Sequence, residues 1–467
     1  MNSNKKYGYL VRNTMLFTIS SFGSKVLSFL LVPFYTSVLS TADYGKADIL
    51  TTTAGLLIFV FTLNISDAVL RFAIDQCERQ EEILLYGIKV LLKGSVLLGA
   101  VLLLCWKLIP AKWESYCYVF LFFNFFNSSL NQIICNYLRA IDRIRAVAIS
   151  GIITTFFIVT SNILLLLVIK IGLAGYLLSF IIASLASIIY GLLQIWSFHG
   201  KIVFSCCSPK MQREMKHYSI PLIFNGIAWW ANNGIDKYFI SGIIGVANNG
   251  VYAVAYKIPT ILSAFSGIFV QAWNLSALKE YEKSDNDHFF ANMYSAYSTG
   301  MVVICSALIL INIPLSRLLF SKDFFAAWRC SSTLLLSMIF SGLSSFVGSV
   351  FSAVKANKIC AVSTISGAVV NIVLNSVMIS KWGTQGAAIA TAISFMTIWL
   401  VRMIYVRKYI DWKLNMKTDI MAYMLLIIQI VFEHSRGHAY PGQILAFSSI
   451  VILYRSQILR MFQNMKK

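Results

Sequence analysis

Long apolar runs recur from one end of the chain to the other, with short polar segments between them. A helix needs about 20 mostly apolar residues to cross a bilayer, whereas membrane strands would show roughly ten-residue apolar and polar alternation. The pattern predicts about fourteen transmembrane helices. Their expected ranges are 12–39, 46–68, 83–107, 115–138, 146–169, 174–197, 217–242, 250–272, 289–311, 327–353, 359–380, 386–406, 418–433 and 441–459. The expected fold class is therefore an all-α polytopic membrane protein.

Composition supports this class. Of the 467 residues, 58% are hydrophobic and 12% are charged, and the mean hydropathy is +0.72. Ordinary soluble domains are less apolar and carry about twice as much charge. The first apolar run is too long for a signal-peptide core, so we expect an uncleaved first helix. The nine cysteines have no paired spacing, and this argues against both a disulfide framework and a metal site.

The formal charge of +20 suggests nucleic-acid binding, but the distribution of the basic residues argues against this interpretation. With a cytoplasmic N-terminus, the inner loops hold 24 of the 39 lysines and arginines and the outer loops hold 8. This asymmetry is typical of cytoplasmic loops and predicts that both termini lie in the cytoplasm. No predicted loop exceeds about 20 residues, so we expect no nucleic-acid partner and no catalytic domain outside the membrane.

The chain contains a repeat. "STADYGKAD" around Gly45 matches "GVANNGVYA" around Gly250, and "KIGLAG" from Lys170 matches "KWGTQG" from Lys381. "KLIP" with "INIP" and "DRIRAVAIS" with "NKICAVSTIS" fall in the same order, at offsets between 204 and 215 residues. A repeat of six helices keeps its orientation, so two parallel lobes with a central cavity are expected. The expected parts are 1–200, 210–410 and a two-helix extension at 415–467. A repeat kept only for structure remains an alternative.

Seven basic residues fall inside the apolar runs. An ionised side chain near the bilayer centre costs about 2.5 to 3.5 kcal/mol on insertion scales, so it normally faces a wet cavity or a partner. Arg329 and Arg402 lie near helix ends and are expected to extend their charges to the membrane surface. The others are Lys25, Lys89, Lys93, Lys237 and Lys257.

Lys25 lies deep in the first helix, on one face with Ser21 and Ser28. Packing against neighbouring helices would explain the hydroxyls but not the lysine, so we expect this face to line a cavity. Lys93 is the deeper of two lysines on the third helix. A cavity-lining position and an outward position both fit it.

The stretch "NNGIDKYFISGIIGVANNGVYAVAYKIP" adds polar candidates to the seventh and eighth helices. They are Asn232, Asn233, Asp236, Lys237 and Lys257. Asp236 and Lys257 are at similar depth on either side of the "NNG" turn, so an ion pair is geometrically reasonable. Such a pair either staples the hairpin or serves the cavity, and the sequence leaves both open. Pro259 is expected to kink the eighth helix.

No motif for catalysis, a metal or a cofactor competes with this reading. The five histidines lie in loops or at helix ends without ligand spacing, and Gly-rich phosphate loops and nucleophile elbows are absent. We therefore expect a protein that is not an enzyme and that needs no cofactor.

The segments "LVPFYTSVLSTADYGKADI" and "IDKYFISGIIGVANNGVYAVAYKI" resemble the polysaccharide transporter family of the multidrug/oligosaccharidyl-lipid/polysaccharide exporter superfamily, and within it the bacterial O-antigen flippases. That family has an acid followed by a base where Asp236 and Lys237 stand, and then a Gly-x-Tyr turn, here Gly250 to Tyr252. The resemblance implies a flippase of the bacterial inner membrane that moves an undecaprenyl-diphosphate-linked oligosaccharide by alternating access. It also implies the O-antigen polymerase machinery as a partner.

The candidate residues suit such a substrate. Lys25, Lys257 and Lys93 would supply cations for the diphosphate, and amides and hydroxyls would bind sugars. Among the relatives, drug exporters often carry an acid on the first helix, which residues 13–39 lack, and peptidoglycan-precursor flippases concentrate arginines around the cavity. A membrane-embedded glycosyltransferase or polymerase would generally carry a sizeable outer loop. These three functions remain alternatives.

Overall fold

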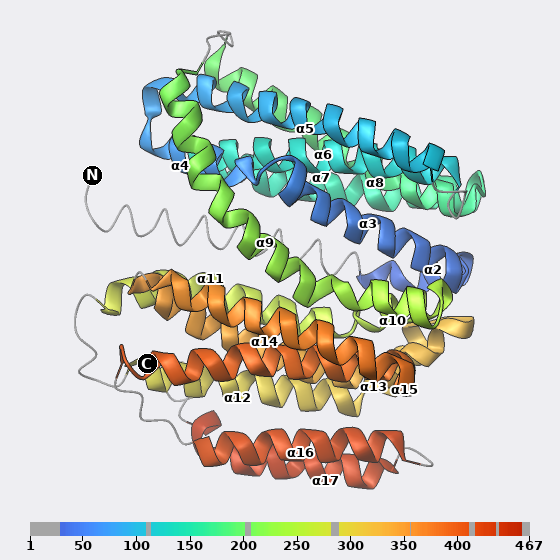
Figure 1. Ribbon diagram of the computed structural model, residues 1–467. Coiled ribbons are helices and arrows are strands. Elements are labelled where there is room, and N and C mark those ends of the chain that lie inside the picture. Colours follow the sequence, from blue (N-terminus) through green and yellow to red (C-terminus); the bar gives the residue numbers. More distant parts are fainter. Residues whose placement is uncertain are drawn as a thin grey trace. The chain divides into compact units, whose positions relative to one another are not determined.

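The computed structural model describes residues 29–108, 114–200, 207–281, 289–354, 356–410, 416–435 and 439–459 (Figure 1). Within these residues every regular element is a helix and no strand occurs. Seven helices are long and apolar enough to cross a membrane, and a bent helix pair raises this to eight. The all-α membrane class is confirmed. Ser21, Lys25 and Ser28 lie outside the described residues.

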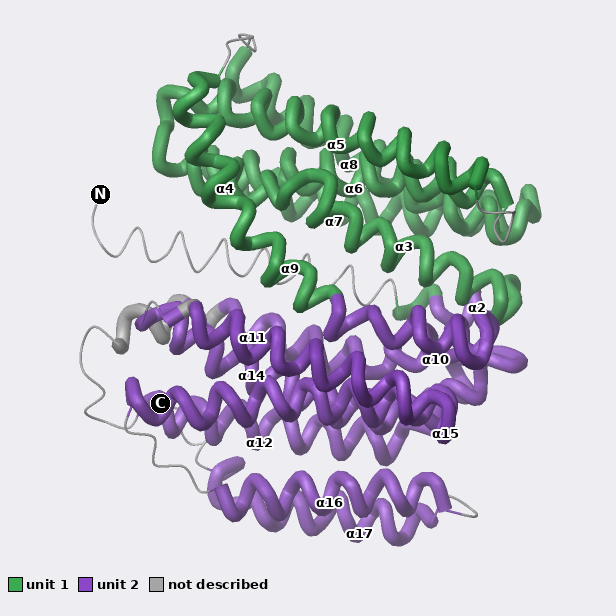
Figure 2. Tube along the Cα trace, viewed as in Figure 1, with its two compact units in different colours: residues 1–31, 38–230 green, residues 32–37, 231–467 purple. Residues whose placement is uncertain are grey.

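The helices form two compact units (Figure 2). Unit 1 contains the described residues among 1–31 and 38–230. Its elements are α3 (Thr41–Phe61), α4 (Ile65–Asp75), η1 (Cys77–Arg79), α5 (Gln80–Leu108), α6 (Ser115–Ala140), α7 (Ile144–Asn162), the π-helical η2 (Ile163–Val168), α8 (Gly172–His199) and the first part of α9 (Pro209–Ile243). The helix expected at 46–68 is broken, because Leu63 and Asn64 take positive φ angles of 53° and 50°.

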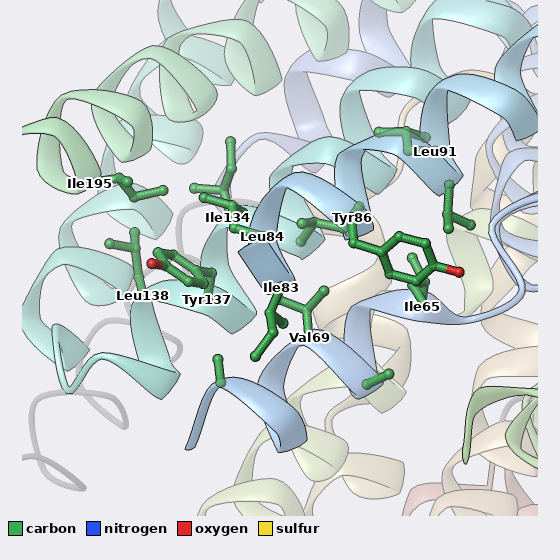
Figure 3. Packing of buried hydrophobic residues seen from close by; sticks show 14 of the residues in the cluster. Ile65, Val69, Ile83, Leu84, Tyr86, Leu91, Ile134, Tyr137, Leu138 and Ile195 are labelled. Carbon is green, nitrogen blue, oxygen red and sulfur yellow. The ribbon is translucent and has the colours of Figure 1, made fainter. Parts of the chain in front are cut away.

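The interior of unit 1 is an apolar cluster from α4, α5, α6 and α8 (Figure 3). Val69 of α4, Ile83 of α5, Ile134 of α6 and Ile195 of α8 are all fully buried. Burying an aliphatic side chain of this size is worth about 1.5–3 kcal/mol relative to water. In a bilayer, close packing of these side chains is what holds such helices together.

Unit 2 contains the described residues among 32–37 and 231–467. Its elements are α2 (Val32–Val38), the remainder of α9, α10 (Val246–Ala255), α11 (Pro259–Tyr281), α12 (Phe289–Leu310), α13 (Asn312–Leu319), η3 (Lys322–Ala327), α14 (Trp328–Ala353), α15 (Asn357–Val406), α16 (Met416–His434) and α17 (Tyr440–Leu453). Helix α14 is central, because it packs against α11, α12 and α15. The Trp273 ring of α11 stacks on Phe346 of α14 with centroids 4.3 Å apart.

The division into units differs from the lobes expected at 1–200 and 210–410. It falls inside α9, between Trp230 and Ala231, and it assigns 32–37 to unit 2. Residues 32–37 belong to unit 2 because of contacts with residues distant in sequence. The Thr36 hydroxyl donates to the Leu319 carbonyl at 3.2 Å and accepts from the Ser321 amide at 3.2 Å. Helices α16 and α17 both pack on α12 and so belong to unit 2.

Two pairs of matched positions in the repeat have corresponding features in the structure. Helix α3 begins at Thr41 and α10 begins at Val246, which are 205 residues apart, as are Gly45 and Gly250. Gly172 and Gly383, equivalent in "KIGLAG" and "KWGTQG", both take positive φ, 60° and 58°. Only glycine adopts this region without steric cost, so both turns depend on it.

Two predicted breaks are confirmed in unit 2. Helices α10 and α11 meet at Pro259 with a bend of 49°. Helix α15 is interrupted at Gly383, whose φ of 58° and ψ of −139° are not helical, between the helices expected at 359–380 and 386–406. The Ser394 hydroxyl donates to the Gly367 carbonyl at 2.9 Å, so the first arm (357–382) and the second arm (384–406) lie side by side.

Candidate functional site

The centre of the candidate site is the Asp236 carboxylate on α9, which is 1% exposed. Its Oδ2 accepts hydrogen bonds from the hydroxyls of Tyr252 at 2.7 Å, Tyr256 at 3.2 Å and Thr391 at 3.3 Å. Its Oδ1 accepts from the Lys237 backbone amide at 2.9 Å. Three hydroxyls from α10, the turn after it and α15 therefore replace the water that a carboxylate would otherwise need.

The ion pair considered between Asp236 and Lys257 is not formed. Among the described residues, the side chains that hydrogen-bond to Asp236 are the three hydroxyls, while the Lys237 ammonium acts on it electrostatically. Lys257 follows Tyr256 directly and is half-buried. The hydroxyls of Tyr252 and Tyr256 therefore occupy the position beside Asp236 that the sequence suggested for Lys257.

Asn232 lies one helical turn before Asp236 and is fully buried. Its Nδ2 donates to the Thr364 carbonyl at 3.0 Å, and its Oδ1 accepts from the Ser394 hydroxyl at 2.8 Å. Thr364 belongs to the first arm of α15 and Ser394 to the second. A single amide of α9 thus joins both arms.

Arg402 extends this chain of contacts toward the other end of α15. Its Nε donates to the Ser363 hydroxyl at 2.9 Å, its Nη2 to the Thr364 hydroxyl at 3.1 Å and its Nη1 to the Ser344 carbonyl at 2.7 Å. The expectation that Arg402 reaches the membrane surface is wrong, because the side chain is only 3% exposed. Its partners come from α14 and the first arm of α15, far from it in sequence.

These residues form two hydrogen-bonded clusters inside unit 2, one around Asp236 and one around Asn232 and Arg402, which are together called the polar network. Thr391, Ser394 and Arg402 lie on one face of the second arm at helical spacing, opposite Asn232 and Asp236 of α9. The network is defined as Asn232, Asp236, Tyr252, Tyr256, Ser344, Ser363, Thr364, Thr391, Ser394 and Arg402. It places one acid and one base in the interior of unit 2, and inside a membrane such groups mark functional positions by default.

A comparison with protein families identifies the chain. Residues 10–274 match the family described as polysaccharide biosynthesis protein, and this is more than half of the 467 residues. The chain belongs to this family.

Two curated relatives of this family member are archaeal. A probable low-salt glycan biosynthesis flippase of Haloferax volcanii is 20% identical over 207 residues, which cover 44% of each chain. An uncharacterised membrane protein of Methanocaldococcus jannaschii is 23% identical over 250 residues, which cover 50% of this chain and 59% of the relative. The chain therefore spans about half the length of the curated relatives that it matches.

Solved structures share the fold of this polysaccharide biosynthesis protein. The lipid II flippase MurJ in an inward closed conformation superposes with a TM-score of 0.71 at 16% identity, covering 95% of this chain and all of that one. An inward-facing multidrug resistance transporter of the MATE family gives a TM-score of 0.65 at 12% identity, covering 83% and 94% of the two chains. The multi-pass fold is that of these transporters.

The side chains of the other described candidate residues of this family member are not members of the network. Asn233 is exposed and Lys237 is half-buried on α9. Lys93 is exposed on α5 of unit 1, on a face with Val96 and Leu97, which are 76% and 59% exposed. Asn232 and Asp236 are thus both members of the network in unit 2, whereas Lys93 belongs to unit 1.

Sequence reasoning missed several members of the network. Tyr252 stands in the Gly-x-Tyr turn, so the family pattern contained a signal for it, and Arg402 was visible as a charge in an apolar run. Thr391 and Ser394 gave none, because hydroxyls are common in membrane helices. Within the described residues, no group of three His, Cys, Asp or Glu side chains is arranged to hold a metal ion.

Proposed function

We propose that this chain is a flippase that moves an undecaprenyl-diphosphate-linked oligosaccharide, an O-antigen or similar repeat unit, to the periplasmic leaflet of a bacterial inner membrane. The family match over residues 10–274 carries the proposal. The fold shared with a lipid II flippase supports it. Transport would proceed by alternating access, with both termini in the cytoplasm and the O-antigen polymerase machinery as the consumer of the product.

The burial of the candidates divides their proposed roles. Lys257 and Lys237 are half-buried and Asn233 is exposed, and the proposed role of these side chains is to contact the substrate. Asn232 and Asp236 are buried and hydrogen-bonded to other residues of the chain. Their proposed task is to hold α9 against α10 and α15 so that the neighbouring polar side chains face the substrate.

The cations of the proposed diphosphate site are Lys25 and Lys257, with Lys93 as a third candidate and Ser21 and Ser28 as polar neighbours of Lys25. A hydrogen bond from a charged donor contributes about 1.5–3 kcal/mol. Removing one such lysine is therefore expected to weaken diphosphate binding by roughly ten- to a hundredfold.

Complementation of a flippase-deficient strain tests the site. Lys25→Ala and Lys257→Ala should shorten or remove the surface O-antigen ladder while the protein stays in the membrane, and Lys257→Arg should restore it. Lys210→Ala, which removes an exposed lysine near the start of α9, serves as the matched control. Normal ladders from both alanine variants at native expression would rule out the diphosphate site.

Reconstitution tests the substrate class. The purified chain in liposomes should translocate a fluorescent polyprenyl-diphosphate oligosaccharide. Cells that express the chain should remain as sensitive to cationic drugs as cells without it. Drug resistance without glycolipid movement would replace the proposal with a multidrug exporter. Cysteine labelling of the two termini in intact cells and in inverted vesicles would check the predicted orientation.

A further inference from the structure

Unit 2 carries an apolar groove of about 580 Å³ between the second arm of α15 and α16, with α14 beneath it. On α15 its wall consists of Ile389, Ile393, Met396 and Leu400, whose spacing of four, three and four places them on one helical face. Sites that hold a whole small ligand have volumes of about 300–1,000 Å³. The groove is therefore large enough to hold a ligand and chemically suited to a hydrocarbon chain.

The groove is open along its side. Met424 and Ile427 of α16 are 59% and 50% exposed, and Leu400 of α15 is 42% exposed, although all three line it. From Leu400 to Gln385 the second arm extends about 22 Å, at 1.5 Å per residue. An acyl chain of ordinary length can lie along it from the bilayer side without entering the interior of unit 2.

One end of the groove is basic. The exposed face of α15 continues from Leu400 to Ile404, one turn further, and then to Arg407 and Lys408, both exposed. On the other wall Met416, the first residue of α16, lines the groove and is followed by the exposed Lys417. None of the ion pairs found within the described ranges uses these three basic side chains.

Among the described residues, the acidic residue closest in sequence to Lys417 is directed elsewhere. Asp419 is buried, and its Oδ1 accepts a hydrogen bond from the Tyr454 hydroxyl at 2.8 Å. Three positive charges thus stand at the mouth of an apolar groove. In the orientation predicted from the basic loops, this end lies at the cytoplasmic leaflet, where anionic lipids attract lysine and arginine by about 1 kcal/mol each.

We propose that the groove between α15 and α16 binds one anionic glycerophospholipid of the bilayer, with an acyl chain along the groove and its phosphate at Arg407, Lys408 and Lys417. Charge complementarity favours this occupant over a second copy of the chain, which would bring like charges together. The site is separate from the polar network and does not depend on the transported substrate.

Lipid retention by the full-length protein tests the proposal. The protein is delipidated in detergent and incubated with an equimolar mixture of phosphatidylglycerol and phosphatidylcholine, and the bound lipids are counted by native mass spectrometry. The wild-type chain should retain phosphatidylglycerol preferentially. A triple variant, Arg407→Gln, Lys408→Gln and Lys417→Gln, should lose that preference by at least about tenfold, and added salt should weaken it in the wild-type chain.

Two further variants separate the groove from surface charge. Ile427→Trp fills the groove and should reduce retention of both lipids several-fold. The charge-matched control, Lys210→Gln, Arg213→Gln and Lys216→Gln at the exposed start of α9, should retain phosphatidylglycerol as the wild-type chain does. Lys417→Glu provides a single-site test should the triple variant unfold.

Unchanged phosphatidylglycerol retention in the triple variant and in Lys417→Glu would overturn the proposal, as would unchanged retention in Ile427→Trp. Loss of phosphatidylglycerol retention in the α9 control would also overturn it, because the preference would then depend on the net charge of the protein and not on the groove. A polyprenyl-diphosphate lipid that phosphatidylglycerol does not displace would identify a different occupant, and so would a dimer without bound lipid.

Discussion

The two units match at several positions of the sequence repeat but differ in what their interiors contain. Unit 1 is filled by an apolar cluster. Four acidic or basic side chains are buried among the described residues, namely Asp236, Arg402, Asp419 and Glu433, and all of them belong to unit 2. Since unit 1 folds without such groups, the repeated architecture does not require them.

Equivalent positions show the same contrast. At the offset of 211 residues that joins "KIGLAG" to "KWGTQG", Gly191 corresponds to Arg402. A Cβ on Gly191 would lie 2.5 Å from Cγ2 of Ile134, so α8 and α6 are in close contact at that point. At the offset of 205, buried Leu31 corresponds to Asp236. Where unit 1 uses close apolar packing, unit 2 uses hydrogen-bonded charges.

Removing the guanidinium should have the largest effect. Arg402→Ala leaves the Ser344 carbonyl and the Ser363 and Thr364 hydroxyls without their donor and opens a cavity, so unfolding in detergent should require about 3–5 kcal/mol less. Arg329→Ala is the matched control, because Arg329 is exposed beside Trp328 and should change stability by less than about 0.5 kcal/mol. Equal effects would mean that the buried contacts of Arg402 are not stabilising.

Giving Asp236 the side chain of its counterpart should come next. Asp236→Leu leaves the hydroxyls of Tyr252, Tyr256 and Thr391 buried without their acceptor, which should cost about 1–3 kcal/mol of stability. Asp236→Asn keeps an acceptor and should retain most stability and transport. A stable Asp236→Asn protein that no longer transports would show instead that the charge itself takes part in the transport cycle.

The close contact in unit 1 can be tested in the opposite sense. Gly191→Ala adds a methyl group against Ile134, and the resulting separation of α8 and α6 should cost about 1–3 kcal/mol in thermal unfolding. Gly242→Ala is the control, since a Cβ there meets nothing within 4 Å. Equal stability of the two variants would show that the contact tolerates the methyl group.

The smallest expected effect is at the rim of unit 1. A hydrogen bond from Tyr116, and then the Lys46 ammonium with its Nζ 3.4 Å from Oε1, hold the pKa of Glu114 below its ordinary value. A lowered carboxyl pKa stabilises the folded state at neutral pH, and this contribution is lost as the pH falls through the folded-state pKa. Glu114→Gln should slightly flatten the acid side of the pH profile of thermal unfolding. An unchanged profile would show that the exposed pair contributes nothing measurable.

Much of the fold could be predicted because its signals are local. The apolar runs, the bend at Pro259 and the interruption of α15 at Gly383 follow from residues within a few positions of each feature. The break after α3 was missed, since it depends on positive φ angles at Leu63 and Asn64 that leave little trace in hydrophobicity. The inclusion of α16 and α17 in unit 2, where the sequence suggested a separate extension at 415–467, was also not foreseeable, since it depends on packing with α12.

For the site, the sequence alone determined that the seventh and eighth helices carry the polar candidates Asn232, Asn233, Asp236, Lys237 and Lys257 in an apolar surrounding. Only the tertiary structure decided which of them are buried and what they contact. Asp236 meets Thr391 across 155 residues, and Arg402 meets Ser344 across 58. The cost of burying a charge depends on whether partners surround it, and those partners are brought together only when α9, α10, α14 and both arms of α15 pack.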